Sequence, residues 1–144
     1  MSPTPHVRSA LATVKSFAEL SGQTLAYMGD AVIELLVRRR AVAAGITDVG
    51  ELNAFSRRFV TASAQSSAVG RMLPSLSEEE ESVYKRGRNA HGVRAPKNAT
   101  TADYRRATGM EALFGYLFLS GQSERVQTLF DIAYFDIAYS EVEE

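Results

Sequence analysis

The chain contains no cysteine and no tryptophan, and only two histidines. The absence of cysteine excludes a disulfide framework, a thiolate nucleophile and a zinc–thiolate site. Neither His6 nor His91 has a nucleophile and an acid arranged near it, so a catalytic triad is not expected. Phosphate loops of the Walker type are missing, and no run approaches the roughly 20 apolar residues that span a bilayer. With no signal-peptide pattern either, the sequence favours an unexported, cytoplasmic protein.

What the chain does contain is typical of one soluble domain. It has 144 residues, of which 45% are hydrophobic and 23% are charged. A chain of this length has room for one core and not for two. We expect residues 1–18 to be a loosely ordered lead-in, residues 19–139 to form the single domain, and residues 140–144 to be an acidic tail.

Apolar residues recur at three- and four-residue steps, which predicts helices, and nothing resembles a strand. The predicted fold is therefore all-α. Gly, Pro and capping residues divide the chain into helices. Ser77 and Glu80 form a capping box, and Thr47 or Asp48 can cap an earlier helix. The apolar positions expected to face the core are Leu25, Met28, Val32, Leu35 and Leu36 after Gln23; Val49, Leu52, Phe55 and Phe59; Val83; Met110, Leu113, Phe114, Leu117 and Phe118; and Val126, Leu129 and Ile132 after Ser123.

Charge is segregated along the chain although the net charge is only −1. Residues 85–106 carry seven cations and one acid, whereas residues 121–144 carry six acids and one arginine. Such a pattern is compatible with a polyanion-binding face and a separate acidic end. A solvated basic loop would produce the same pattern.

Two acids interrupt apolar helices. Asp30 lies in Tyr-Met-Gly-Asp-Ala-Val, and Glu111 lies in Met-Glu-Ala-Leu-Phe-Gly. Unpaired carboxylates in core helices are costly, so each demands a cation. One reading pairs them with arginine, from the set Arg38, Arg39 and Arg58, or makes Asp30 a helix cap. The other brings both acids together as oxygen ligands for Mg²⁺, which could activate water for phosphodiester hydrolysis.

The residues around these acids resemble a known family. The segment 25–34, Leu-Ala-Tyr-Met-Gly-Asp-Ala-Val-Ile-Glu, is similar to the signature helix of ribonuclease III endonucleases, and the segment 110–116 resembles their second catalytic helix. The segments 56–65, 78–90 and 96–105 are similar to Mini-ribonuclease III, the short branch that lacks a double-stranded-RNA-binding domain. The five segments cover roughly residues 20–125.

The resemblance implies an all-helical homodimer that cleaves double-stranded RNA with Mg²⁺, and in this branch matures the precursor of the large-subunit (23S) ribosomal RNA. Asp30 and Glu111 would be both the catalytic acids and the metal ligands. Ala26 and Thr108 stand where larger ribonuclease III enzymes have acids, so one Mg²⁺ per subunit is expected. Thr108 would then support the ligands without touching metal. Glu34 could at most support the ligands in the same way, because an ion pair with Arg38 one turn later also accounts for an acid at this position.

A-form RNA is recognised through its shape, phosphates and 2′-hydroxyls. The residues expected to contact RNA are Arg57, Arg58, Lys85, Arg86, Arg88, Asn89, His91, Lys97, Asn98, Tyr104, Arg105 and Arg106. For His91 an idle surface position is favoured over a phosphate contact. Tyr27 and Tyr104 are expected in the core, as aromatic residues beside small ones usually are, with RNA contact as the alternative. The apolar segment 113–119 suits either a dimer interface or the core.

Two other functions are compatible with the sequence. One is a non-catalytic RNA-binding or ribosome-assembly protein on the same fold, although a binding module gains nothing from two uncompensated acids. The other is a helical protein-interaction domain. Shape recognition leaves no base-specific code in the chain, so a ribosomal protein that shapes the RNA could supply selectivity. The acidic end is either its docking surface or a solubilising tail.

Overall fold

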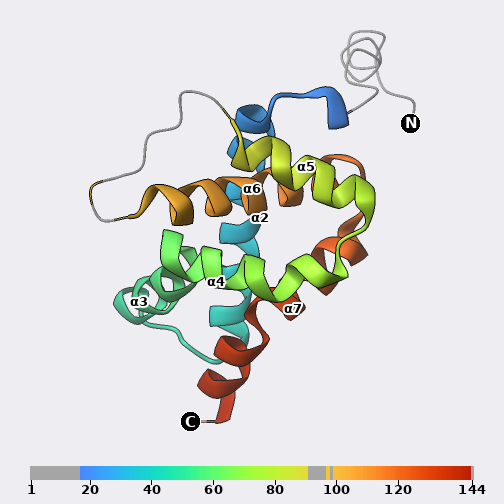
Figure 1. Cartoon of the computed structure of the whole chain (residues 1–144). Coiled ribbons are helices and arrows are strands. Elements are labelled where there is room, and N and C mark those ends of the chain that lie inside the picture. The colour runs from blue at the N-terminus through green and yellow to red at the C-terminus, as the bar shows by residue number, and fades with distance from the viewer. Residues whose placement is uncertain (1–16, 91–96, 98, 144) are drawn as a thin grey trace, which may run out of the picture.

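The structure is a computed structural model and describes residues 17–90, 97 and 99–143, with only the backbone of residues 18 and 135–143. The lead-in up to residue 16, His91 and Asn98 therefore lie outside the described residues. All described elements are helices, as the sequence predicts, and they are arranged as in Figure 1. Their bounds are η1 Phe17–Glu19, α2 Gly22–Ala43, α3 Val49–Val60, α4 Ala62–Met72, η2 Leu73–Ser75, α5 Glu78–Arg88, α6 Thr101–Leu119 and α7 Ser123–Glu143.

Side-chain caps fix where the helices begin. The Asp48 carboxylate accepts from the Glu51 N–H, so Asp48 rather than Thr47 caps α3. The predicted capping box is confirmed, because Ser77 and Glu80 each accept a backbone N–H from the other. Glu80 is also held by Arg125 of α7 through two hydrogen bonds of 2.7 and 2.8 Å. The start of α5 is therefore tied to α7.

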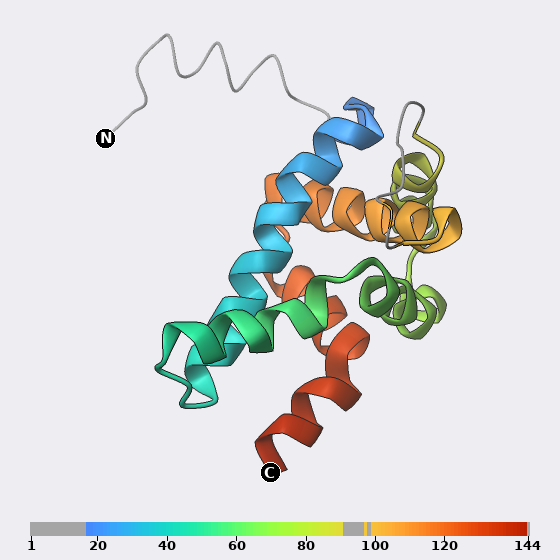
Figure 2. The ribbon, with the colours of Figure 1, turned by 90° about the vertical axis from the view of Figure 1, so that its left-hand side faces the viewer.

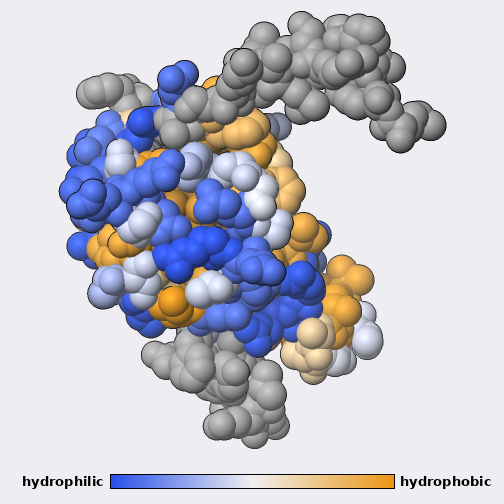
Figure 3. Space-filling view, turned by 90° about the vertical axis from the view of Figure 1, so that its right-hand side faces the viewer, coloured by the Kyte–Doolittle hydropathy of each residue, from blue (hydrophilic) through white to orange (hydrophobic). Residues whose placement is uncertain are grey.

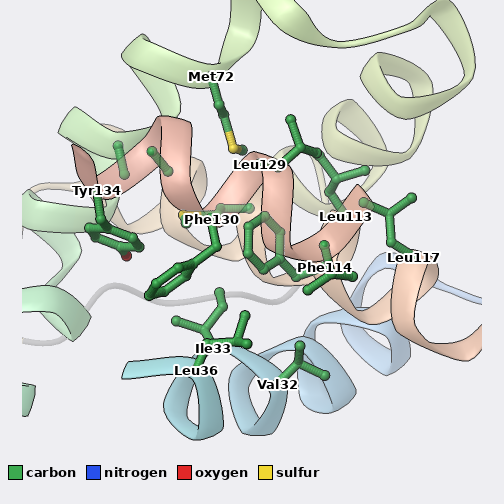
Figure 4. Packing of buried hydrophobic residues seen from close by; sticks show 14 of the residues in the cluster. Val32, Ile33, Leu36, Met72, Leu113, Phe114, Leu117, Leu129, Phe130 and Tyr134 are labelled. Carbon is green, nitrogen blue, oxygen red and sulfur yellow. The ribbon is translucent and has the colours of Figure 1, made fainter. Parts of the chain in front are cut away.

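The core surrounds α6, which packs against α2, α4 and α5, and it extends to α7 (Figures 1 and 2). Figure 4 shows side chains from α2, α6 and α7 converging, with Met72 of α4 above them. Leu113, Phe114 and Leu117 are fully buried inside one chain. Their burial decides between the two readings of segment 113–119: residues 113–117 belong to the core and provide no dimer interface.

Several apolar side chains expected in the core are instead exposed. Tyr27 is 83% exposed, Leu35 64%, Val49 69% and Phe118 44%. Each of these residues lies on a helix whose opposite side is buried. The apolar periodicity therefore predicted the helices correctly, but it also assigned to the core positions at the edge of each apolar face. On the face of the molecule shown in Figure 3, hydrophilic residues predominate and apolar ones are scattered.

Two glycines allow α2 and α6 to cross at backbone contact. A Cβ added to Gly29 would lie 1.6 Å from the carbonyl oxygen of Glu111, and one added to Gly115 would lie 2.0 Å from that of Leu25. No side chain fits between the two backbones at either point. This crossing fixes Asp30, the neighbour of Gly29, beside Glu111.

Helix α7 is interrupted at Tyr134, where φ is −120° and ψ is 17°. Arg71 donates to the carbonyl of Ala133 at 2.6 Å, and the Tyr134 hydroxyl donates to the carbonyl of Phe59 at 2.9 Å. The interruption falls between the two copies of Phe-Asp-Ile-Ala-Tyr at 130–139. In the first copy Phe130, Ala133 and Tyr134 are buried, so that copy anchors α7 to the core.

Candidate active site

The α2–α6 crossing forms the floor of a cleft of about 680 Å³. Helix α2 and the first half of α6 form two sides, and the junction of α3 and α4 forms another. Asp30 and Glu111 both line this cleft, so the structure brings together the two acids that the sequence singled out. The lining residues are Gln23, Ala26, Tyr27, Asp30, Val60, Thr61, Ala62, Ser63, Gln65, Ala99, Thr100, Asp103, Tyr104, Ala107, Thr108 and Glu111.

The two acids have different environments. Burial is the main cause that raises the pKa of Glu111 to about 8, and hydrogen bonding and charge repulsion from the neighbouring Asp30 carboxyl contribute to the same shift. Asp30 itself is exposed, so its expected position in the core is wrong. It follows Gly29 on the side of α2 that opens on the cleft. Only one of the pair is therefore strongly desolvated.

No described arginine or lysine forms an ion pair with Asp30 or Glu111. Pairing with arginine, one of the two readings of the sequence, is therefore not found in the described part of the chain. Arg38 instead pairs with Glu34 at 3.3 Å, which is the surface ion pair expected for residues one turn apart. Asp30 is not a cap either, since Ser21 caps α2.

Thr108 is buried one turn before Glu111 and lines the cleft. Its hydroxyl donates to the carbonyl of Tyr104 at 2.9 Å. Glu34 does not line the cleft. Of the two residues expected to support the ligands, only Thr108 therefore lies at the site.

The pair of carboxylates suits a hard cation. Mg²⁺ binds through one or two carboxylates and completes its shell with water and phosphate oxygens. Two adjacent acids without a basic partner, one of them desolvated, are a donor set of this kind. Within residues 17–90, 97 and 99–143 no cluster of three or more acids, histidines or cysteines could enclose a metal. The site thus fits a Mg²⁺ ion that keeps most of its coordination positions for water and substrate.

The basic residues lie in three places. Arg57 and Arg58 are exposed in the last turn of α3, just before the cleft residues Val60 and Thr61. Arg105 and Arg106 are exposed on α6, next to Tyr104, which is half-buried and lines the cleft.

The third place is the C-terminal end of α5, with Lys85, Arg86, Arg88 and Asn89, and none of these residues lines the cleft. Lys85 pairs with Glu81 at 3.1 Å, Arg86 donates to the carbonyl of Leu20, and Arg88 lies 5.8 Å from the centre of the Tyr84 ring. Asn89 accepts a hydrogen bond from Arg88, and Lys97 is exposed.

Sequence reasoning missed several polar residues of the cleft, among them Asp103, Thr61 and Gln65. Asp103 was counted only as a charge, although it is a third acid in the lining. Thr61 and Gln65 lie in the segment 56–65, which resembles the family, but nothing in the sequence marks these two residues as part of a site. Only the structure shows that helix α4 begins at the cleft.

None of the described helices is long and apolar enough to cross a lipid bilayer.

Comparison with known proteins identifies the family of the chain. The family model for the ribonuclease III domain matches residues 23–122. The chain is 46% identical over 110 residues to Mini-ribonuclease 3 of Symbiobacterium thermophilum, covering 76% of this chain and 85% of the relative. It is 43% identical over 118 residues to Mini-ribonuclease 3 of Enterococcus faecalis, covering 81% and 89%. A crystal structure of a Fusobacterium nucleatum protein matches with a TM-score of 0.73 and 29% identity, covering 82% of this chain and 94% of that one.

The fold and the matched residues place the chain in the ribonuclease III family. Within that family it belongs to the Mini-ribonuclease III branch, and it is an endoribonuclease. This outcome removes the non-catalytic RNA-binding protein and the protein-interaction domain as principal functions.

Proposed function

We propose that the protein is a Mg²⁺-dependent homodimeric endoribonuclease that hydrolyses double-stranded RNA with Asp30 and Glu111. One observation carries the proposal: two adjacent carboxylates share a cleft with no described basic partner. The family assignment fits this chemistry because ribonuclease III enzymes act on double-stranded RNA. The substrate we propose is the precursor of large-subunit ribosomal RNA, which the resemblance of the sequence to the Mini-ribonuclease III branch implies.

The chain contributes position and charge to the reaction. Asp30, on the open side of the cleft, and Glu111, on its floor, would hold the ion between them. When bound, Mg²⁺ supplies a Lewis acid and lowers the pKa of a coordinated water. The close approach at Gly29 keeps the two backbone segments that carry the carboxylates in contact. Arg57, shortly before the cleft residues of the α3–α4 junction, and Arg105, next to the cleft residue Tyr104, can hold RNA phosphates by charge-assisted hydrogen bonds.

The test is cleavage of a long RNA duplex in Mg²⁺ and in excess chelator. Replacing Asp30 with Asn or Glu111 with Gln removes a ligand charge and nearly no volume. We expect either change to reduce cleavage at least about 100-fold, because metal catalysis supplies several kcal/mol. Titration calorimetry of Mg²⁺ should show weaker binding to both variants, independently of activity.

Asp131→Asn is the matched control, since it removes an acid on α7 that pairs with Arg40 and does not line the cleft. It should cleave within about twofold of the parent, as expected for loss of an exposed ion pair. Cleavage by Asp30→Asn at the parent rate, or cleavage that persists in chelator, would contradict the proposed metal site.

A further inference from the structure

The junction of α3 and α4 presents unused hydrogen-bond donors to the cleft. Thr61 caps α4, and its side chain accepts from the Ala64 N–H at 3.2 Å, while its carbonyl accepts from Gln65 N–H at 2.9 Å. The first N–H groups of a helix have no partner within it. The N–H groups of Ala62 and Ser63 are of this kind, and both residues line the cleft. The positive end of the α4 dipole therefore faces the cleft.

Gln65 adds a second and independent feature. Its side chain is only 4% exposed and lines the same cleft. Among the described residues no hydrogen bond satisfies its carboxamide. Among the described residues, only Arg71 Nη2 is a side-chain polar atom that has neither a hydrogen-bond partner nor contact with solvent. The Gln65 amide, which has no partner, must therefore be in contact with solvent, and its remaining accessible surface opens on the cleft.

A largely buried amide without a protein partner is costly to a fold. A ligand that supplies the missing hydrogen bonds removes this cost. The donors here are the Gln65 amide and two main-chain N–H groups, all uncharged, beside the positive end of a helix. This set suits an anionic oxygen, and the anion that a ribonuclease cleft receives is a phosphodiester.

We infer that Gln65, together with the N–H groups of Ala62 and Ser63, forms an uncharged subsite for a backbone phosphate of RNA in the cleft. The inference rests on the proposed function, because it assumes that RNA enters this cleft. The subsite is separate from the arginines and lysines, which hold phosphate by charge. Its contribution to binding is therefore a hydrogen-bonding one that leaves the number of ionic contacts unchanged.

The test compares the parent chain with Gln65→Met and Gln65→Glu, using a short RNA duplex in excess chelator so that only binding is measured. Methionine keeps the volume and removes the polar atoms. We expect Gln65→Met to weaken RNA binding roughly 3- to 10-fold, which corresponds to one neutral hydrogen bond, and Gln65→Glu to weaken it further by repelling phosphate. The dependence of log K on log salt should keep its slope in Gln65→Met.

Two further readouts exclude a merely structural role. Gln65→Met should unfold at the same temperature as the parent or higher, because an unpaired buried amide is lost. Arg57→Met is the control with the opposite signature, since losing a cation should lower the salt slope by about 0.7–0.9. A Gln65→Met variant that is less stable and yet binds RNA like the parent would overturn the inference. Absence of Mg²⁺-dependent cleavage by the parent chain would instead refute the proposed function.

Discussion

At the scale of single residues, Glu111 is the clearest case of a group whose environment is unfavourable without a ligand. Its pKa is raised to about 8 by burial and by Asp30, whereas an unfolded glutamate titrates near 4.5. At pH values between about 4.5 and 8, Glu111 therefore stays protonated in the folded state and is ionised in the unfolded state. The free energy of unfolding of the metal-free protein therefore falls as the pH rises from about 4.5 to 8.

Glu111→Gln should remove this pH dependence. In chelator at pH 8 we expect the variant to be more stable than the parent by about 2–4 kcal/mol, which raises the unfolding temperature by roughly 5–10 °C. At pH 5 the two should differ little, and saturating Mg²⁺ should stabilise only the parent. Thermal unfolding at both pH values, with and without Mg²⁺, measures this. Equal unfolding temperatures at pH 8 in chelator would contradict the raised pKa.

The residue scale also shows what the sequence could and could not predict. Asp30 and Glu111 stand out because carboxylates are rare in apolar helical segments, and both lie in the cleft. The exposure of Asp30 and of Tyr27 was not predictable, because a local pattern does not say which side of α2 the rest of the chain covers. Gln65 belongs to a segment that resembles the family, but the sequence did not single it out, because its place in the cleft depends on where α4 begins relative to α6.

At the scale of elements, helix ends were predictable and helix crossings were not. Caps such as Ser77 act within one turn, so the sequence contains them in full. The crossing of α2 and α6 depends on residues far apart in sequence, Gly29 and Gly115 among them. A glycine within a helix normally costs about 1 kcal/mol relative to alanine. At Gly29 that cost permits the backbone contact that brings Asp30 beside Glu111.

Gly29→Ala should therefore be severely destabilising. The added Cβ would lie 1.6 Å from a main-chain oxygen, and the obstacle is backbone rather than a flexible side chain. We expect a loss of more than about 3 kcal/mol, or no folding at all, measured by urea unfolding. Gly70→Ala in α4 is the matched control: a Cβ there meets nothing within 4 Å, so it should stabilise by up to about 1 kcal/mol. Similar effects of the two substitutions would show that the α2–α6 contact is looser than described.

At the scale of the whole molecule, α2 exposes apolar side chains that no other part of the described chain covers. Tyr27, Leu35 and Val42 are 83%, 64% and 63% exposed and recur at steps of eight and seven residues, which places them on one side of the helix. Tyr27 also lines the cleft, so this side of α2 continues from the candidate active site. The core does not need these side chains, and the residues 113–117 that might have formed a dimer interface are already buried.

We therefore expect a second copy of the chain to cover this side of α2, since a twofold axis buries the same apolar side chains of both subunits at once. Leu35→Glu places a charge in the middle of that interface and should convert a dimer into a monomer, measured by sedimentation at micromolar concentration. Val49→Glu is the matched control, because Val49 is 69% exposed but lies at the start of α3. The control should remain dimeric. A parent chain that sediments as a monomer would refute the homodimer, and a dimeric Leu35→Glu variant would move its interface away from α2.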